Sequence, residues 1–306
     1  MNQPATHVPL LPGTGKPELP KDLEAQVERA LAEDVGSGDV TAALVAADAW
    51  TEAYVIAKEP AVVCGIAWFD AVFRRLDERI TVRWSFSEGH SAKSGEVLCR
   101  LQGPARAILT GERTALNFLQ TLSGTATLTR KFVERLRGTK TEIVDTRKTL
   151  PGFRSAQKYA VATGGGVNHR FGLYDAYLIK ENHIAAAGSL AKAMEQARAA
   201  HPDLPLMAEA ENLEQVKDAL DGKADVLLLD DFPTHLLSKA VAMSRDYRRY
   251  NKANTRIEAS GGVNLLNVRD IADTGVDRIS VGALTKNAQA VDLSMRFGRP
   301  EDEAKN

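Results

Sequence analysis

The chain has 306 residues, of which 44% are hydrophobic and 26% are charged, a composition typical of a soluble globular protein with a sizeable core. The formal net charge is −1, so no overall positive field favours nucleic acid or a membrane surface as a partner. No apolar run approaches the roughly 20 residues that cross a bilayer, and the N-terminus lacks the pattern of a secretory signal. The two cysteines, Cys64 and Cys99, have no metal-binding or redox spacing. We therefore expect a cytoplasmic protein that binds neither nucleic acid nor membrane.

The first part of the chain predicts an extended arm followed by a mixed α/β region. Five prolines within residues 1–20 prevent a helix or a sheet ladder from propagating there, so we expect this stretch to be an extended arm. Helical and strand-like patterns then follow in turn. The expected elements are a helix at 21–34, strands at 52–57, 80–86 and 96–101, a helix from Gly65 to about Leu76, and a helix at 106–136 that is broken near Gly124.

From residue 141 onward, the pattern changes to short apolar runs, most of which are separated by helical segments. Such alternation predicts parallel strands joined by helices, and this many repeats suggests a barrel. Six runs are present where a complete barrel has eight strands, so we expect the barrel to be incomplete or to include a strand that the pattern hides. The runs are 142–144, 176–179, 206–208, 226–229, 256–259 and 278–281.

Polar or glycine-rich residues follow every one of these runs. The C-terminal ends of barrel strands meet at one mouth, where active sites lie, so six consecutive caps of this kind predict a site there. Glu209 and Glu211 share one face of their strand with Met207, and we expect both glutamates to point into the mouth. The caps are Asp145-Thr146-Arg147-Lys148, Lys180-Glu181-Asn182-His183, Glu209-Ala210-Glu211-Asn212, Asp230-Asp231, Ser260-Gly261-Gly262 and Gly282-Ala283-Leu284-Thr285.

Two parts of this predicted mouth suit anions. The segment 145–180 carries six cations and two anions, and three successive glycines let its backbone approach a ligand just before His169 and Arg170. Arginine suits planar carboxylates, and lysine suits phosphate. The glycine-rich caps at 260–262 and 282 read as a phosphate site, because the loops after the last two barrel strands often bind phosphate at a helix N-terminus. A solvated basic loop and a plain turn are the alternative interpretations.

These motifs resemble those of the quinolinate phosphoribosyltransferase family, whose members are also called nicotinate-nucleotide pyrophosphorylase (carboxylating). The resemblance runs from about residue 22 to 298. It is carried by Glu33-Asp34-Val35-Gly36-Ser37-Gly38-Asp39-Val40-Thr41, Gly111-Glu112-Arg113-Thr114-Ala115-Leu116-Asn117, Asp145-Thr146-Arg147-Lys148-Thr149, Gly164-Gly165-Gly166-Val167-Asn168-His169-Arg170, Leu178-Ile179-Lys180-Glu181-Asn182-His183, Leu229-Asp230-Asp231-Phe232, Ser260-Gly261-Gly262 and Ser280-Val281-Gly282-Ala283-Leu284-Thr285.

The resemblance implies an enzyme of NAD biosynthesis. It would transfer phosphoribosyl from phosphoribosyl pyrophosphate to quinolinate with Mg²⁺, giving nicotinate mononucleotide, pyrophosphate and carbon dioxide. The fold implied is an N-terminal α/β sandwich at 21–118, to which residues 288–306 return, beside an incomplete α/β barrel at 119–287 that carries the active site. Subunits would pair head to tail as a homodimer with shared active sites, and the sequence leaves dimer and hexamer open.

The resemblance also implies roles for the residues of the site. Lys148, Glu209 and Asp230 would be catalytic: Lys148 would meet the phosphates, and the two carboxylates would bind ribose hydroxyls or the Mg²⁺, directly or indirectly. Arg113 would reach quinolinate from the partner subunit. Asp231 stands where many relatives have Asn and adds a negative charge beside Asp230. The remaining substrate ligands would be Thr146, Arg147, His169, Arg170 and Lys180 for quinolinate, and Ser260, Gly261, Gly262 and Gly282 for the 5′-phosphate.

Three other functions fit parts of the pattern. Another member of the same fold, such as a nicotinate phosphoribosyltransferase or a transport-associated paralogue, would not release carbon dioxide from quinolinate. A Schiff-base aldolase would use Lys180 at its strand end. A non-catalytic anion-binding protein would not need the pair formed by Glu209 and Asp230. We expect His183 only to cap the helix that follows it.

Overall fold

The computed structural model describes residues 17–251, 254–287 and 289–299, and these form two compact units. Unit 1 comprises Lys131–Thr149 and Gly166–Ala283, while unit 2 comprises the remaining described residues. Residues 119–130 and 150–165, which we placed in the barrel domain, belong to unit 2, and the domain ranges given above stay a prediction. Most of the expected N-terminal arm lies outside the described residues. Within the described part of the chain, no helix is both long and apolar enough to span a bilayer.

Unit 2 contains a four-stranded sheet with the strand order β12-β1-β5-β3, in which β12 (Leu293–Phe297) returns from the far end of the chain to pair with β1. Apolar residues of the sheet and of helices α2 and α3 form one core, in which the Phe69 and Phe73 rings meet edge to face. The other elements are α1 (Leu23–Val35), η1 (Ala42–Leu44), β1 (Trp50–Ala57), β2 (Ala61–Val62), α2 (Ile66–Leu76), β3 (Thr81–Trp84), β4 (Ser91–Ala92), β5 (Val97–Pro104), α3 (Ala105–Arg135, in unit 1 from Lys131) and α4 (Arg154–Thr163).

Helix α3 is continuous, so the predicted break near Gly124 is wrong. The glycine serves close packing instead: a Cβ atom at Gly124 would lie 1.9 Å from the carbonyl oxygen of Gln289. The neighbouring backbone therefore passes too near for any side chain at this position. Glycine fits there although it destabilises a helix by about 1 kcal/mol relative to alanine. The sequence pattern alone cannot tell such a contact from a helix break.

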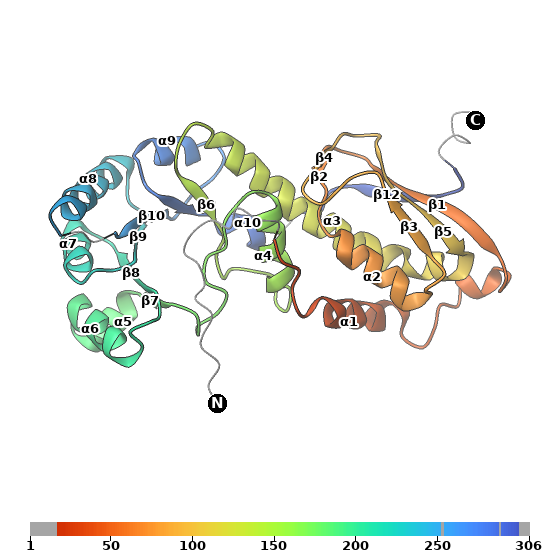
Figure 1. Cartoon of the computed structure of the whole chain (residues 1–306), viewed down its shortest axis with the longest axis horizontal. Helices are drawn as coiled ribbons and strands as arrows, with labels where there is room; N and C mark the ends of the chain where they lie inside the picture. Colours follow the sequence, from red (N-terminus) through yellow and green to blue (C-terminus); the bar gives the residue numbers. More distant parts are fainter. Residues whose placement is uncertain (1–16, 252–253, 288, 300–306) are drawn as a thin grey trace. The chain divides into compact units, whose positions relative to one another are not determined.

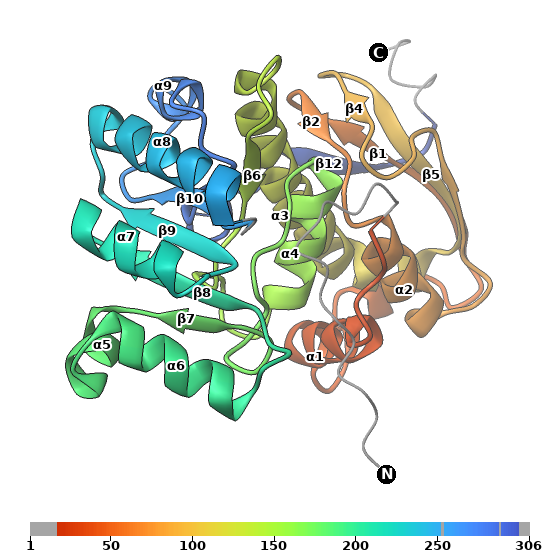
Figure 2. The ribbon, with the colours of Figure 1, turned by 60° about the vertical axis from the view of Figure 1, so that its left-hand side comes forward.

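Unit 1 contains a six-stranded parallel sheet with the strand order β6-β11-β10-β9-β8-β7. Strands β6 and β7 are its two edges, so the barrel is open, which confirms the incomplete barrel. Helices α6 to α9 lie along one face of this sheet (Figures 1 and 2). The elements are β6 (Glu142–Val144), β7 (Tyr177–Ile179), α5 (Glu181–Ala187), α6 (Leu190–Ala200), β8 (Leu206–Ala210), α7 (Leu213–Asp221), β9 (Val226–Asp230), α8 (Thr234–Asn251), β10 (Arg256–Ser260), α9 (Val268–Asp273) and β11 (Arg278–Ser280). Helix α10 (Ala283–Lys286) begins at the last residue of unit 1 and belongs to unit 2 from Leu284.

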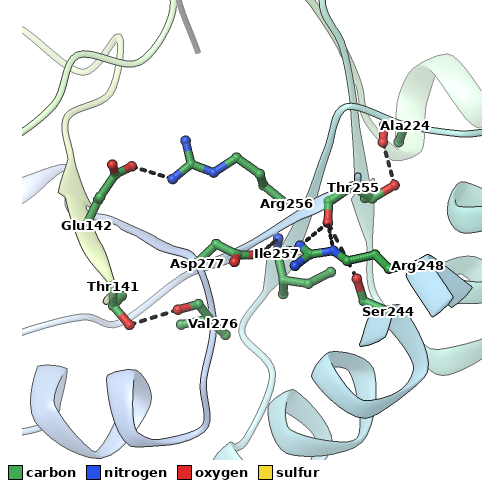
Figure 3. A network of polar contacts seen from close by, with 10 residues as sticks. All are labelled: Thr141, Glu142, Ala224, Ser244, Arg248, Thr255, Arg256, Ile257, Val276 and Asp277. Atoms are coloured by element: carbon green, nitrogen blue, oxygen red, sulfur yellow. Dashed lines mark hydrogen bonds and ion pairs between the residues drawn. The ribbon is translucent and has the colours of Figure 1, made fainter. Parts of the chain in front are cut away.

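A polar network holds the N-terminal ends of β6, β10 and β11 together (Figure 3). Arg248 of α8 bonds the carbonyl oxygen of Thr255 and also donates to Asp277 at 2.9 Å. Arg256 donates to Glu142 at 2.5 Å across the sheet. A cavity of about 380 Å³ opens beside this network. Because the N-terminal face of such barrels serves stability rather than chemistry, we place the site at the opposite ends of the strands.

Candidate active site

The inner face of the unit 1 sheet, opposite the helices, carries a layer of charged side chains. Residues that are neighbours in a parallel register share one face of the sheet, and the register aligns β6, β11, β10, β9 and β8 across the unit. The aligned residues are Glu142, Arg278, Glu258, Leu228 and Glu209. Parallel strands covered on both faces are usually apolar throughout. Four charged residues in one layer therefore indicate that the inner face has a functional role besides packing.

Lys180 and Glu209 form an ion pair where β7 and β8 end. The Nζ atom of Lys180 lies 2.6 Å from Oε2 of Glu209, whose side chain is only 9% exposed. Asp230 ends β9 beside Ser260 in the register. Glu211 lies past the end of β8 and is exposed, so only Glu209 of the two glutamates is buried on the inner face. Three charged side chains therefore lie at the ends of the neighbouring strands β7, β8 and β9: Lys180, Glu209 and Asp230.

His183 has the structural role that we expected. Its Nδ1 atom accepts a hydrogen bond of 3.1 Å from the backbone N–H of Lys180, the residue that precedes α5. The side chain therefore caps the first turn of the helix and satisfies a backbone donor that the helix itself cannot satisfy. This geometry gives His183 no part in chemistry.

Two arginines lie close together beside the loop that follows β6. Burial lowers the pKa of Arg170, and the positive charge of Arg147 lowers it further, while Asp175 opposes the shift. The guanidinium of Arg170 is held by a 3.0 Å bond from Nη1 to the carbonyl oxygen of Ala176. Two cations that repel each other in a partly desolvated place favour an anionic ligand.

Buried Asp145 organises the segment that leads to Arg170. Its carboxylate accepts hydrogen bonds from the Asn168 side chain at 2.7 Å and from the backbone N–H of His169 at 2.8 Å. The side chain of His169 is 7% exposed, and its Nε2 atom lies 3.5 Å from Oε1 of Glu258. Asp145 is therefore a structural anchor, and it fixes where His169 and Arg170 leave the loop.

Thr146, Lys148 and Gly282 come together at the ends of β6 and β11. The hydroxyl oxygen of Thr146 accepts the backbone N–H of Lys148 at 3.0 Å. A Cβ atom at Gly282 would lie 3.2 Å from Cδ of Lys148, which is tighter than most side-chain contacts. Glycine at this position therefore leaves room for the lysine stem to reach over the mouth.

The Ser260-Gly261-Gly262 loop needs its glycines. Gly261 and Gly262 have φ values of +92° and +56°, a region that L-residues with side chains rarely adopt. The backbone N–H of Asp231 donates to the Ser260 carbonyl at 3.0 Å, which joins the loops after β9 and β10. Helix α9 begins only at Val268, so a phosphate at 260–262 would meet loop N–H groups, whereas Gly282 directly precedes α10.

Two cations of the segment 145–180, and Arg113, belong to unit 2. Arg154 and Lys158 belong to α4 in unit 2, and Lys158 is fully buried there. Gly164 also lies in unit 2, where a Cβ atom would be 2.6 Å from the Ala126 carbonyl oxygen of α3. That glycine therefore permits helix packing rather than the approach of a ligand. Arg113 is exposed on the unit 2 part of α3.

The acidic residues at the mouth fit one kind of metal ion. No group of three or more His, Cys, Asp or Glu side chains that could hold a metal occurs among the described residues. Mg²⁺ does not need such a group, because it usually keeps several waters and binds one or two carboxylates together with substrate phosphates. Asp230 and Glu209 are oxygen donors of the kind that it prefers, and they lie near the loops suited to phosphate.

The sequence analysis missed Glu258 and Arg278, both of which are almost fully buried on the inner face. Their strands were read as short apolar runs. A signal was present, because Arg256, Glu258 and Ser260 alternate with Ile257 and Ala259. This alternation is unusual for a parallel strand whose two faces are both covered.

The fold and the site together define an α/β-barrel enzyme with an anion-binding mouth. The family model for the quinolinate phosphoribosyl transferase N-terminal domain matches residues 39–123, and the model for the C-terminal domain of the same family matches residues 125–296. The chain therefore belongs to the quinolinate phosphoribosyl transferase family.

Individual relatives agree with this assignment. The chain is 41% identical over 264 residues to a probable nicotinate-nucleotide pyrophosphorylase [carboxylating] of Bacillus subtilis (strain 168), covering 86% of this chain and 89% of the relative. It is 42% identical over 276 residues to the nicotinate-nucleotide pyrophosphorylase [carboxylating] of Mycobacterium leprae (strain TN), covering 88% and 95%. The solved structure of the nicotinate-nucleotide pyrophosphorylase from Francisella tularensis is similar with a TM-score of 0.87 at 43% identity, covering 92% of this chain and 98% of that one.

Proposed function

We propose that this protein transfers the phosphoribosyl group of phosphoribosyl pyrophosphate to quinolinate, releasing pyrophosphate and carbon dioxide and forming nicotinate mononucleotide for NAD biosynthesis. The observation that carries the proposal is the pairing of Arg147 and Arg170 beside the loop after β6. Burial lowers the pKa of the Arg170 guanidinium and the positive charge of Arg147 lowers it further, while Nη1 of Arg170 is held 3.0 Å from the Ala176 carbonyl oxygen. A pyridine dicarboxylate offers two planar anions to such a pair. The family assignment and the names of the relatives support the same reaction.

Quinolinate would lie against the cations that follow β6 and β7. Arg147 and Arg170 would face its carboxylates, and Thr146 would assist through its hydroxyl and backbone. Lys180 would add a third cation from the neighbouring strand end, where Glu209 already holds its ammonium. An ammonium held in this way is poorly suited to a Schiff base, which requires the unprotonated amine, so the geometry favours substrate binding over the aldolase alternative.

Phosphoribosyl pyrophosphate would lie on the other side of the mouth. The loops at 260–262 and Gly282 would bind its 5′-phosphate through backbone N–H groups, and Lys148 would contact the pyrophosphate. Glu209 and Asp230 would bind the ribose hydroxyls or hold Mg²⁺ together with the phosphates, and the metal would supply positive charge at the leaving group. The carboxylates would also tolerate the positive charge that develops at the anomeric carbon.

The reaction needs no nucleophile from the protein. The bond from the anomeric carbon to pyrophosphate breaks, and the pyridine nitrogen forms the new bond to that carbon. The ring then carries a positive charge, so the bond to the 2-carboxylate can break with its electrons left beside the ring nitrogen, and that carbon afterwards takes up a proton. Positioning and electrostatics are expected to supply most of the rate.

We further propose that the enzyme acts in the cytoplasm as a homodimer with shared sites, or as a hexamer built from such dimers. Cys64 and Cys99 are both free and buried, which suits a reducing compartment. Exposed Arg113 on α3 would enter the site of the partner subunit. The family resemblance supports this sharing, because the family places an arginine at this motif in the neighbouring site.

Labelled carbon dioxide release tests the proposal. Quinolinate labelled in its 2-carboxylate should release label only when phosphoribosyl pyrophosphate and Mg²⁺ are both present, and chelation should stop the release. Nicotinate serves as the comparison substrate, because a nicotinate phosphoribosyltransferase would consume it without releasing carbon dioxide. In single-turnover experiments, Lys148→Ala and Glu209→Ala should each slow the reaction by at least about 100-fold. Rates within a few-fold of the unmodified enzyme would reject these two roles.

A further inference from the structure

Glu258 is a fully buried carboxylate that the proposed reaction does not use. It lies on the inner face of β10, and its side chain has no exposed area. Neither of its oxygen atoms makes a hydrogen bond within the described residues. Its two nearest polar neighbours are His169, with Nε2 at 3.5 Å, and Arg278, with Nε at 3.6 Å. A buried charge is costly unless it is compensated, so retaining a carboxylate here calls for a reason.

The hydrogen bonds of His169 define which nitrogen of its ring carries the proton. The Nδ1 atom accepts the backbone N–H of Arg170 at 2.9 Å, so it carries no proton in this arrangement. The proton of the neutral ring is therefore on Nε2, and this nitrogen faces Glu258. Both ring nitrogens are thus directed at the protein. This arrangement assigns the contact with a substrate carboxylate to the Arg170 guanidinium rather than to the imidazole.

The charges around Glu258 agree with a neutral histidine. Glu258 faces Arg278, and in the same layer Glu142 accepts a hydrogen bond from Arg256. Each carboxylate thus has one guanidinium beside it. In a poorly hydrated interior, a carboxylate 3.5 Å from an imidazole orients the N–H dipole strongly. Glu258 is therefore placed to fix the orientation of the ring and the position of its proton.

We propose that Glu258 is a positioning residue for quinolinate: it holds His169 with its proton on Nε2, so that Nδ1 accepts the Arg170 N–H and keeps the Arg170 guanidinium aimed at the substrate. The inference rests on the proposed function and deepens it, because it explains how one of the two substrate arginines is oriented. Carboxylates often fix the orientation of a histidine ring in this way by contacting its second nitrogen. Here the oriented ring would position the neighbouring Arg170 rather than move a proton.

The variant Glu258→Gln keeps the shape of the side chain and removes its charge. The amide can present either its oxygen or its NH₂ group to His169, so the ring orientation is no longer fixed. We expect the dissociation constant for quinolinate to rise about tenfold. This corresponds to the loss of one hydrogen bond between the Arg170 guanidinium and a substrate carboxylate. The dissociation constant for phosphoribosyl pyrophosphate should change by less than about twofold. The Glu258 side chain faces His169 and Arg278, whereas Ser260-Gly261-Gly262, which follow it, would bind phosphate through backbone N–H groups that the substitution leaves in place.

Glu142→Gln is the matched control. It removes a carboxylate from the same layer of the same sheet, but its recorded partner is Arg256 rather than His169. It should lower stability and leave quinolinate binding unchanged. Equal losses of quinolinate affinity in Glu142→Gln and Glu258→Gln would overturn the proposal, and so would an equal loss of affinity for both substrates in Glu258→Gln.

A double-mutant cycle with His169→Phe shows whether Glu258 acts through the histidine. The two effects on quinolinate binding should overlap, so that the double variant is no weaker than His169→Phe alone; simply additive effects would contradict the proposal. Nitrogen NMR of His169 in the unmodified protein, without substrate, should show a proton on Nε2 and none on Nδ1, and the opposite tautomer would overturn the inference even if Glu258→Gln does not fold. If the protein binds no quinolinate, the proposed function fails, while the tautomer is still decided by the spectrum.

Discussion

At the scale of single residues, a close contact between Gly261 and Asp231 fixes the backbone conformation of the loop after β10. Gly261 has a φ of +92°, and a Cβ atom there would lie 2.0 Å from Oδ1 of Asp231. Asp231 itself has a positive φ of 52°, so both residues at this contact have unusual backbone conformations. Such strain is retained where the surrounding structure fixes the backbone and where function uses the geometry. Here it leaves the backbone of the loop open to a phosphate.

Gly261→Ala should damage this loop more than Gly262→Ala does. Both substitutions place a side chain at positive φ, but a Cβ atom at Gly262 meets nothing within 4 Å, whereas the one at Gly261 collides with Asp231. We expect Gly261→Ala to raise the KM for phosphoribosyl pyrophosphate at least about tenfold and Gly262→Ala to raise it less, each costing about 1 kcal/mol or more in backbone strain. Steady-state kinetics with both substrates varied would measure this. Equal KM values for the two variants would show that the contact with Asp231 is unimportant.

At the scale of elements, the N-terminal ends of the unit 1 strands are joined by Arg248. Its side chain bonds the Thr255 carbonyl and Asp277, and Asp277 also accepts the backbone N–H of Ile257 at 2.7 Å (Figure 3). One arginine of α8 therefore connects the segment before β10 with the segment before β11. These strands carry the loops proposed to bind phosphate at their other ends, so the network keeps the strands in place without entering the candidate site.

Arg248→Ala should lower stability without changing catalysis. Loss of hydrogen bonds from a half-buried guanidinium should reduce the free energy of unfolding by roughly 1–2 kcal/mol, while both KM values should stay within about twofold of the unmodified enzyme. Urea unfolding and steady-state kinetics measure the two quantities. Arg249→Ala is the control, because the neighbouring Arg249 is exposed and such a substitution usually changes stability by less than about 0.5 kcal/mol. A large change in KM for Arg248→Ala would contradict a purely structural role.

The strands of unit 1 could be predicted to within two residues because buried parallel strands are short apolar runs between helices. Charge on the inner face is harder to predict from such runs: the alternation of Arg256 and Glu258 with Ile257 and Ala259 indicates it in β10, whereas Arg278 is a single charge beside an apolar run. Gly124 was misread for a similar reason, because a helix break and a close contact leave the same glycine in the sequence. In both cases the structure depends on contacts with residues distant in the sequence, which the local pattern does not contain.

At the scale of the whole molecule, the order of the strands could not be derived from the sequence. Strands β6 and β7 are consecutive in the chain, yet they form opposite edges of the sheet. Residues 150–165 between them belong to the other unit. Likewise, β12 pairs with β1 across most of the chain's length. The place of the candidate site, by contrast, could be inferred without this topology, because active sites of parallel barrels lie at the strand ends whatever the order of the strands.

Sharing of sites between subunits can be tested with two variants that are inactive alone. Arg113→Ala removes the arginine expected from the partner subunit, and Arg170→Ala removes one from the barrel mouth. In a purified heterodimer of the two, one site should lack both arginines and the other should keep both. Its activity should therefore be about half that of the unmodified dimer, measured as carbon dioxide release after co-expression with two different affinity tags.

The heterodimer of Arg147→Ala with Arg170→Ala is the matched control. Both residues belong to unit 1 of the same chain, Arg147 after β6 and Arg170 before β7, so each site of this heterodimer lacks one arginine and neither should recover activity. Recovery in the first heterodimer and none in the second would establish that Arg113 acts across the interface. If both heterodimers are inactive, Arg113 serves the barrel of its own chain. The head-to-tail pairing that we propose then loses its support, because defects in two different chains complement each other only when a site takes residues from both subunits.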